Sequence, residues 1–169
     1  FKSVTLTVDP MVKYQPVVGF GGMYNPKIWC GDNLISAPQL DKMYGAGGLG
    51  YSILRLMIYP NESDWSADVE AAKAAQANGA IIFACLKEKP DVEIVRIILQ
   101  GLTGPITVNG KEMKHLKKEN YEAYANHLIR YVTFMKEKGV NLYAISVQNE
   151  PDMEFTYWTP SEVVDFVKQ

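Results

Sequence analysis

The sequence lacks several features that would point to a function at once. It has only two cysteines, Cys30 and Cys85, too few and too far apart for a disulfide scaffold or a zinc site, so both are expected to be small core residues. The formal net charge of −2 gives no electrostatic argument for nucleic-acid binding. No apolar run reaches the roughly 18 residues of a membrane helix. We therefore predict no metal, no cofactor, no nucleic-acid partner and no membrane span.

The chain also lacks an initial methionine and a recognisable signal peptide. Residues 1–8 begin like a strand that is already under way, and residues 159–169 end like a helix that has just started. Both ends are therefore expected to be cuts in a longer protein. The 169 residues, of which 47% are apolar, are nevertheless enough for a hydrophobic core.

What the sequence does contain is an alternation of apolar strands and helices. After a half-exposed strand at 3–8, four buried strands are predicted, at 16–22, 49–59, 80–86 and 142–147. Helices are predicted after the capping boxes Ser36–Gln39 and Thr159–Glu162, from about 63–66 to 78, and over 118–138, with a shorter one at 92–99. Strands that are apolar throughout and alternate with helices predict a parallel sheet covered by helices. An Asn-Gly pair within residues 108–111 predicts a hairpin turn.

Two α/β architectures fit this order: an open doubly wound sheet and a (β/α)8 TIM-type barrel. A doubly wound nucleotide-binding domain would normally carry G-x-G-x-x-G between its first strand and helix, whereas GFGG at 19–22 is followed by a long loop. We favour the barrel, of which this chain would supply about the first four strand–helix units. An open-sheet nucleotide binder would instead hold a phosphate near residues 19–22.

Polar residues follow the last predicted strand abruptly, in the stretch ISVQNEP at 145–151. In a (β/α)8 barrel the residues at the carboxyl ends of the strands form the catalytic mouth. Glu150 is expected to be half-buried there and to hold a proton near neutral pH, and Asn149 can hydrogen-bond a sugar hydroxyl. The structural alternative is a glutamate that only caps the following loop.

Arg55 stands out as the one charge in the apolar strand 49–59. It either lies in the mouth, paired with a carboxylate that must stay ionised, or forms a buried ion pair that stabilises the barrel. Aromatic residues are placed to line the same mouth, and their faces suit the apolar faces of sugar rings. We predict substrate contacts for Tyr157, Trp158 and Trp29, and a packing role for Trp65.

Several segments together resemble glycoside hydrolase family 30, and within it the xylanase and glucuronoxylanase branch. They are GFGGM (19–23), LGYSILR (49–55), AKAAQANGAIIFA (72–84), the long block from 116 to 152 that ends in NEPD, and YWTPSEVVDF (157–166). The resemblance implies a retaining hydrolase of β-1,4-xylan-type polysaccharide or oligosaccharide, with Glu150 as general acid/base and Asn149 on the hydroxyl next to the anomeric carbon. Arg55 matches an active-site arginine of the family. Residues 1–15 would belong to a side β-domain and 16–169 to the first half of the barrel.

The same resemblance implies a partner, because the family's nucleophilic glutamate comes from strand seven and lies beyond Gln169. The missing carboxyl-terminal half of the barrel is therefore expected, and residues 1–169 alone should be inactive. The family's Pro-Trp-x-Pro-Pro segment after strand three is replaced here within Leu86–Gly104. Other activities of the family, on β-glucosides including glucosylceramide or on β-1,6-glucan, stay open, as does a non-catalytic carbohydrate-binding protein. A polymer substrate would make the protein secreted, periplasmic or bound at the cell surface.

Overall fold

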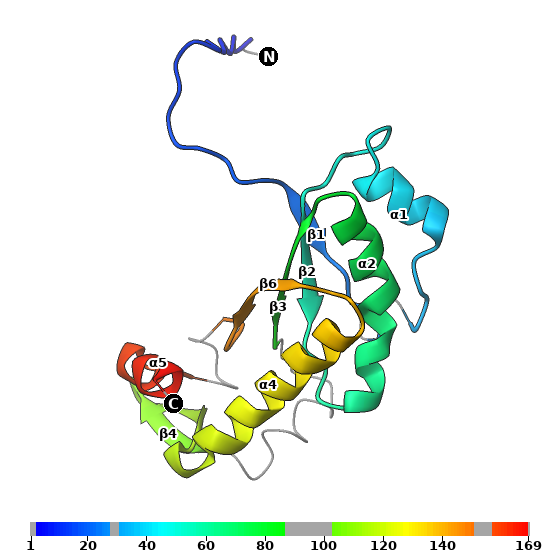
Figure 1. The fold of residues 1–169 in the computed structure, drawn as a ribbon. Coiled ribbons are helices and arrows are strands. Elements are labelled where there is room, and N and C mark those ends of the chain that lie inside the picture. The colour runs from blue at the N-terminus through cyan, green and yellow to red at the C-terminus, as the bar shows by residue number, and fades with distance from the viewer. Residues whose placement is uncertain (1–2, 28–30, 87–102, 151–156, 169) are drawn as a thin grey trace.

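The computed structural model describes residues 3–27, 31–86, 103–150 and 157–168, which form an α/β unit built on a parallel sheet (Figure 1). The four strands lie in the order β1-β2-β3-β6, with parallel pairing throughout. Their bounds are β1 Gly21–Met23, β2 Ile53–Met57, β3 Ile81–Cys85 and β6 Leu142–Ser146. The predicted parallel sheet is therefore confirmed, with β2 and β3 at its centre and β1 and β6 outside.

Helices connect these strands in the predicted alternation. They are α1 (Ala37–Tyr44), the 3-10 turn η1 (Glu62–Asp68) with α2 (Val69–Ala77), the 3-10 turn η2 (Lys118–Asn120) with α4 (Tyr121–Glu137), and α5 (Pro160–Val167). Both predicted capping boxes are present. The Ser36 backbone N–H donates to Gln39 Oε1 at 2.8 Å, and that of Thr159 donates to Glu162 Oε2 at 2.8 Å. The helix predicted at 92–99 lies outside the described residues.

One face of the sheet packs against helices and forms the core. α2 contacts β2 and β3, and α4 contacts β6 (Figure 1). The side chains on this face are at most 1% exposed in the two central strands: Leu54, Leu56, Ile82 and Ala84. The alternate positions point to the opposite face, where Arg55 and Phe83 are only half-buried. Arg55 thus projects from the face that the helices leave uncovered.

The two outer strands differ from the sequence prediction. Only residues 21–23 of the predicted strand 16–22 pair with β2, and Val17, Val18 and Phe20 are exposed. In β6, which was expected to be buried, Tyr143 is 76% exposed. Both predictions of burial are wrong for the same reason: no described strand covers the outer edge of β1 or β6. Gly21 is required for the pairing that does form, because a Cβ there would collide with the Ile53 carbonyl.

The amino-terminal segment runs away from the sheet and is exposed over residues 3–18 (Figure 1). The strand predicted at 3–8 is not formed, because no described strand lies beside it to complete its backbone hydrogen bonds. The hairpin prediction is confirmed. β4 (Thr103–Val108) and β5 (Lys111–Leu116) pair antiparallel through Asn109 and Gly110, which both have positive φ, as a two-residue type I′ turn requires. No described helix is long and apolar enough to cross a membrane.

Candidate functional site

The candidate site lies where the carboxyl ends of β2, β3 and β6 meet at one edge of the sheet. The loop after β6 is tied down there on two sides. The Asn149 backbone N–H donates to the Leu86 carbonyl at 3.2 Å, which joins this loop to the end of β3. The Tyr124 hydroxyl on α4 donates to the Val147 carbonyl at 2.6 Å. Residues 147–149 are therefore held in place by both the sheet and the helix layer.

Arg55 and Asn149, two of the predicted site residues, are in direct contact. Arg55 Nη2 donates to Asn149 Oδ1 at 2.5 Å across the intervening strand β3. Because a guanidinium only donates hydrogen bonds, the amide of Asn149 must turn its oxygen toward Arg55 and its NH2 group away. The carboxylate partner expected for Arg55 is not found: none lies within ion-pair distance among the described residues. The guanidinium bonds instead to Asn149 and to the sulfur of Cys85.

Glu150 follows Asn149 directly, but its side chain is exposed. The expected half-burial is wrong, because β6 is an outer strand and no described segment forms a wall on its far side. The backbone of Glu150 is nevertheless unusual. Its φ of 48° lies in the left-handed region, which costs a non-glycine residue roughly 1 kcal/mol or more. Strained residues of this kind cluster at functional sites. Backbone strain, and not burial, therefore distinguishes Glu150 in this structure.

Gln148, the first polar residue after the strand, has a structural task. It is 7% exposed, and its side-chain Nε2 donates to the Asn149 carbonyl at 2.8 Å. The hydroxyl of Ser146 donates to the Gln148 carbonyl at 2.8 Å. The Gln148 side chain thus satisfies the backbone of the loop from inside.

Of the three predicted aromatic contacts, Trp158 and Tyr157 lie in the described residues, and the contacts described for them are with elements other than the strands of the site. Trp158 is only 7% exposed, stacked on Tyr121 at 5.9 Å and packed against Phe166 at 5.3 Å, so the structure gives it a packing role between α4 and α5. Tyr157 is half-buried, and its backbone N–H donates to the Lys114 carbonyl of the hairpin at 2.7 Å. Trp29 lies outside the described residues. The packing role predicted for Trp65 is confirmed, since it is 2% exposed.

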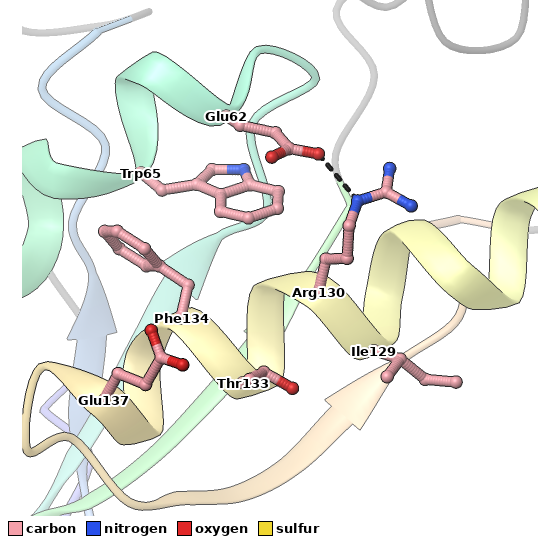
Figure 2. A pocket seen from close by; sticks show the side chains of 7 residues that line it. All are labelled: Glu62, Trp65, Ile129, Arg130, Thr133, Phe134 and Glu137. Atoms are coloured by element: carbon pink, nitrogen blue, oxygen red, sulfur yellow. Dashed lines mark hydrogen bonds and ion pairs between the residues drawn. The ribbon is translucent and has the colours of Figure 1, made fainter.

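A hollow of about 400 Å³ lies elsewhere, between η1 and α4 on the helix side of the sheet (Figure 2). Trp65 and Phe134 line it, and an exposed ion pair between Arg130 Nε and Glu62 Oε1, at 2.7 Å, bridges it. None of the predicted site residues contributes to this hollow. Within the described residues, no three His, Cys, Asp or Glu side chains are grouped to hold a metal ion.

Cys85 was predicted to be a small core residue, and its 1% exposure confirms this, but its contact with Arg55 was not predicted. The register of β2 and β3, which the sequence does not specify, brings the two side chains together. Cys85 pairs with Met57, two residues after Arg55, and therefore lies on the same face of the sheet as that arginine. The Arg55 Nε donates to its Sγ at 3.0 Å.

Comparison with known proteins identifies relatives of the chain, although no protein-family model matches it. The chain is 43% identical over 168 residues, 97% of its length, to "Glucuronoxylanase XynC" of Bacillus subtilis (strain 168), of which it covers 37%. Among solved structures, a glycoside hydrolase family 30 subfamily 8 xylanase from Clostridium acetobutylicum matches 93% of the chain with a TM-score of 0.67 and 31% identity. The endo-β1,6-glucanase BT3312 matches 95% with a TM-score of 0.69, but at 18% identity it shows the fold alone.

The chain spans about two fifths of the length of these relatives, 37% of the first, 39% of the second and 41% of the third. Within that part, the predicted resemblance to the xylanase and glucuronoxylanase branch of glycoside hydrolase family 30 is confirmed, because these relatives are glucuronoxylanases and a family 30 xylanase.

Proposed function

We propose that this chain is part of a retaining glycoside hydrolase of family 30 that cleaves β-1,4-xylan-type polysaccharide. The observation that carries the proposal is the contact between Arg55 and Asn149, one residue before Glu150, at the carboxyl edge of a parallel sheet. In barrel enzymes this edge is where catalytic residues lie. The 43% identity to a glucuronoxylanase over 97% of the chain supports the substrate class.

In the proposed mechanism Glu150 is the general acid/base. It protonates the departing sugar oxygen in the first step and removes a proton from the attacking water in the second. The NH2 group of Asn149, which faces away from Arg55, donates to the hydroxyl next to the anomeric carbon. Hydrogen bonds at that hydroxyl strengthen in the transition state, so the fixed amide would lower the barrier.

The proposal requires more chain than these residues. Retaining hydrolysis needs a second carboxylate about 5–5.5 Å from the first as nucleophile. We assign none here, and propose that the remaining length found in the relatives supplies it and closes the (β/α)8 barrel. We propose that the same additional strands and helices would cover Glu150, which is exposed in the loop after β6. Because xylan is a polymer outside the cell, we also propose that the protein acts there.

The direct test is Glu150→Gln and Glu150→Ala in the full-length protein. Release of reducing sugar from glucuronoxylan should fall by about 100-fold or more, since general acid catalysis alone contributes roughly 10²–10⁴-fold. Azide should rescue the alanine variant on an aryl xyloside with a good leaving group, giving a β-glycosyl azide. That product would show that the glycosyl-enzyme step survives without the proton donor.

The matched control is Glu137→Gln, which changes an exposed glutamate of α4 and should leave activity intact. Wild-type activity in Glu150→Gln would remove the assignment. A full-length protein that binds xylo-oligosaccharides but releases no sugar would instead indicate a non-catalytic carbohydrate-binding protein. A nucleotide binder is not favoured, because Gly21 and Gly22 are used in pairing with β2.

A further inference from the structure

We infer that Cys85 is a positioning residue of this site: its sulfur orients the Arg55 guanidinium, which in turn orients Asn149. The contacts stand on the structure alone. The catalytic consequence rests on the proposed function. NMR measures the contact and kinetics measures the catalytic consequence, so either part can fail independently.

Hydrogen bonds connect side chains from three neighbouring elements. Cys85 ends β3, Arg55 lies on β2, and Asn149 follows β6 on the other side of β3. Arg55 donates to Cys85 Sγ through Nε, at 3.0 Å, and also through Nη2. The same Nη2 reaches Asn149 Oδ1. Two donors on one sulfur fix both the position and the rotation of the guanidinium plane, and a fixed plane determines where Asn149 is held.

The burial of Cys85 supports a role for its sulfur as the hydrogen-bond acceptor of Arg55. Cys85 is 1% exposed, so water cannot easily take its place beside Arg55, which is itself half-buried. A long arginine side chain loses conformational entropy when it is held in one geometry, and something must offset that loss. If Cys85 only filled space, any side chain of similar volume would serve. If it acts as an acceptor, a hydroxyl should replace it and a methyl group should not.

The test compares Cys85→Ser, which keeps an acceptor, with Cys85→Ala and Cys85→Val, which do not. In the full-length protein, kcat on glucuronoxylan should fall by about tenfold in the alanine and valine variants with KM nearly unchanged. The reason is that a displaced Asn149 loses an interaction that matters most in the transition state, and misplacement of about 1 Å can cost up to 10²-fold. The serine variant should recover most of kcat.

Ile82→Val is the matched control. It shortens a buried side chain of the same strand on the opposite face, so it should lower the thermal midpoint without changing kcat. Alanine is smaller than cysteine and valine is larger, so a loss of kcat common to both cannot be ascribed to volume; valine also suits a strand and serves if the alanine variant does not fold. Equal kcat in all variants, or equal losses in serine and alanine, would overturn the inference, because neither pattern depends on an acceptor.

The contact itself can be measured without any activity. The Nε–Hε NMR signal of Arg55, assigned by its disappearance in Arg55→Lys, should shift and exchange faster with water in Cys85→Val than in Cys85→Ser. An unchanged signal in both would overturn the positioning role even if the enzyme were active. A changed signal in a protein that hydrolyses no xylan would retain the positioning role and reject the proposed function.

Discussion

Asp68 is a residue whose ionisation should control stability. It is the last residue of η1 and fully buried, and burial raises the pKa of its carboxyl to about 8, against weaker opposing hydrogen bonds from Tyr59 and the Met57 backbone. The Tyr59 hydroxyl is the donor toward Asp68 Oδ1, 3.3 Å away, and it also lies 3.1 Å from Asn25 Oδ1. The other carboxyl oxygen, Oδ2, is buried without a hydrogen-bond partner among the described residues, which favours the neutral acid over the carboxylate.

Because the folded pKa lies above the unfolded value of 3.8, the folded state holds the extra proton between about pH 4 and pH 8. Stability should therefore fall as pH rises through that window and level off above it. The free energy of unfolding can fall by at most about 1.4 kcal/mol for each unit by which the folded pKa exceeds the unfolded pKa. Asp68→Asn keeps the shape and a donor but does not titrate, so urea unfolding should show a flatter pH dependence. Parallel curves for the two proteins would contradict the assignment.

At the residue scale the structure places Arg55 and Asn149 together at the carboxyl edge of the sheet, while their roles in catalysis stay a prediction. Arg55 and Asn149 could be predicted because a charge in an apolar strand and an amide at a strand end are both costly without a purpose. The link from Arg55 to Cys85 could not, because it depends on strand order and register. The packing of Trp158 against α4 and α5 was not predicted for a related reason: whether an aromatic ring faces a cleft or a core depends on the elements around it.

Among the elements, α5 owes its start to a capping box that can be tested. The Glu162 backbone N–H donates to Thr159 Oγ1 at 3.2 Å, and the Glu162 carboxylate accepts from the Thr159 backbone. Thr159→Ala removes one half of this exchange and should lower the free energy of unfolding by about 1 kcal/mol. Chemical denaturation would measure it. Thr133→Ala, the same truncation at an exposed site inside α4, should be neutral or slightly stabilising.

Equal losses of stability in Thr159→Ala and Thr133→Ala would show that the capping box is not the cause.

The elements themselves were predictable where local rules determine them. The capping boxes located the starts of α1 and α5, and an Asn-Gly pair located the hairpin turn. The burial of β1 and β6 was not predictable, because apolar composition indicates that a strand belongs in a core but not whether its neighbours are present. Val17 and Tyr143 are exposed for that reason.

At the scale of the whole molecule, the described part of the sheet has two outer edges, and the described helices pack on one of its faces. Tyr143 on β6 is 76% exposed, and Phe20, next to β1, is 73% exposed. Unpaired strand edges with apolar side chains are templates for association with other strands. Local sequence patterns predicted the parallel sheet. Closure into a barrel depends on long-range pairing and on chain length, which such patterns do not specify.

Residues 1–169 on their own should therefore self-associate, whereas a full-length protein with a closed barrel should not. Light scattering after size exclusion would measure the mass of each. Tyr143→Lys places a charge on the exposed edge strand and should shift the short chain toward monomer, since edge lysines oppose strand pairing. Val164→Lys, which adds the same charge at a half-exposed site on α5, should have less effect. A short chain that is monomeric without any substitution would show that these edges need no cover.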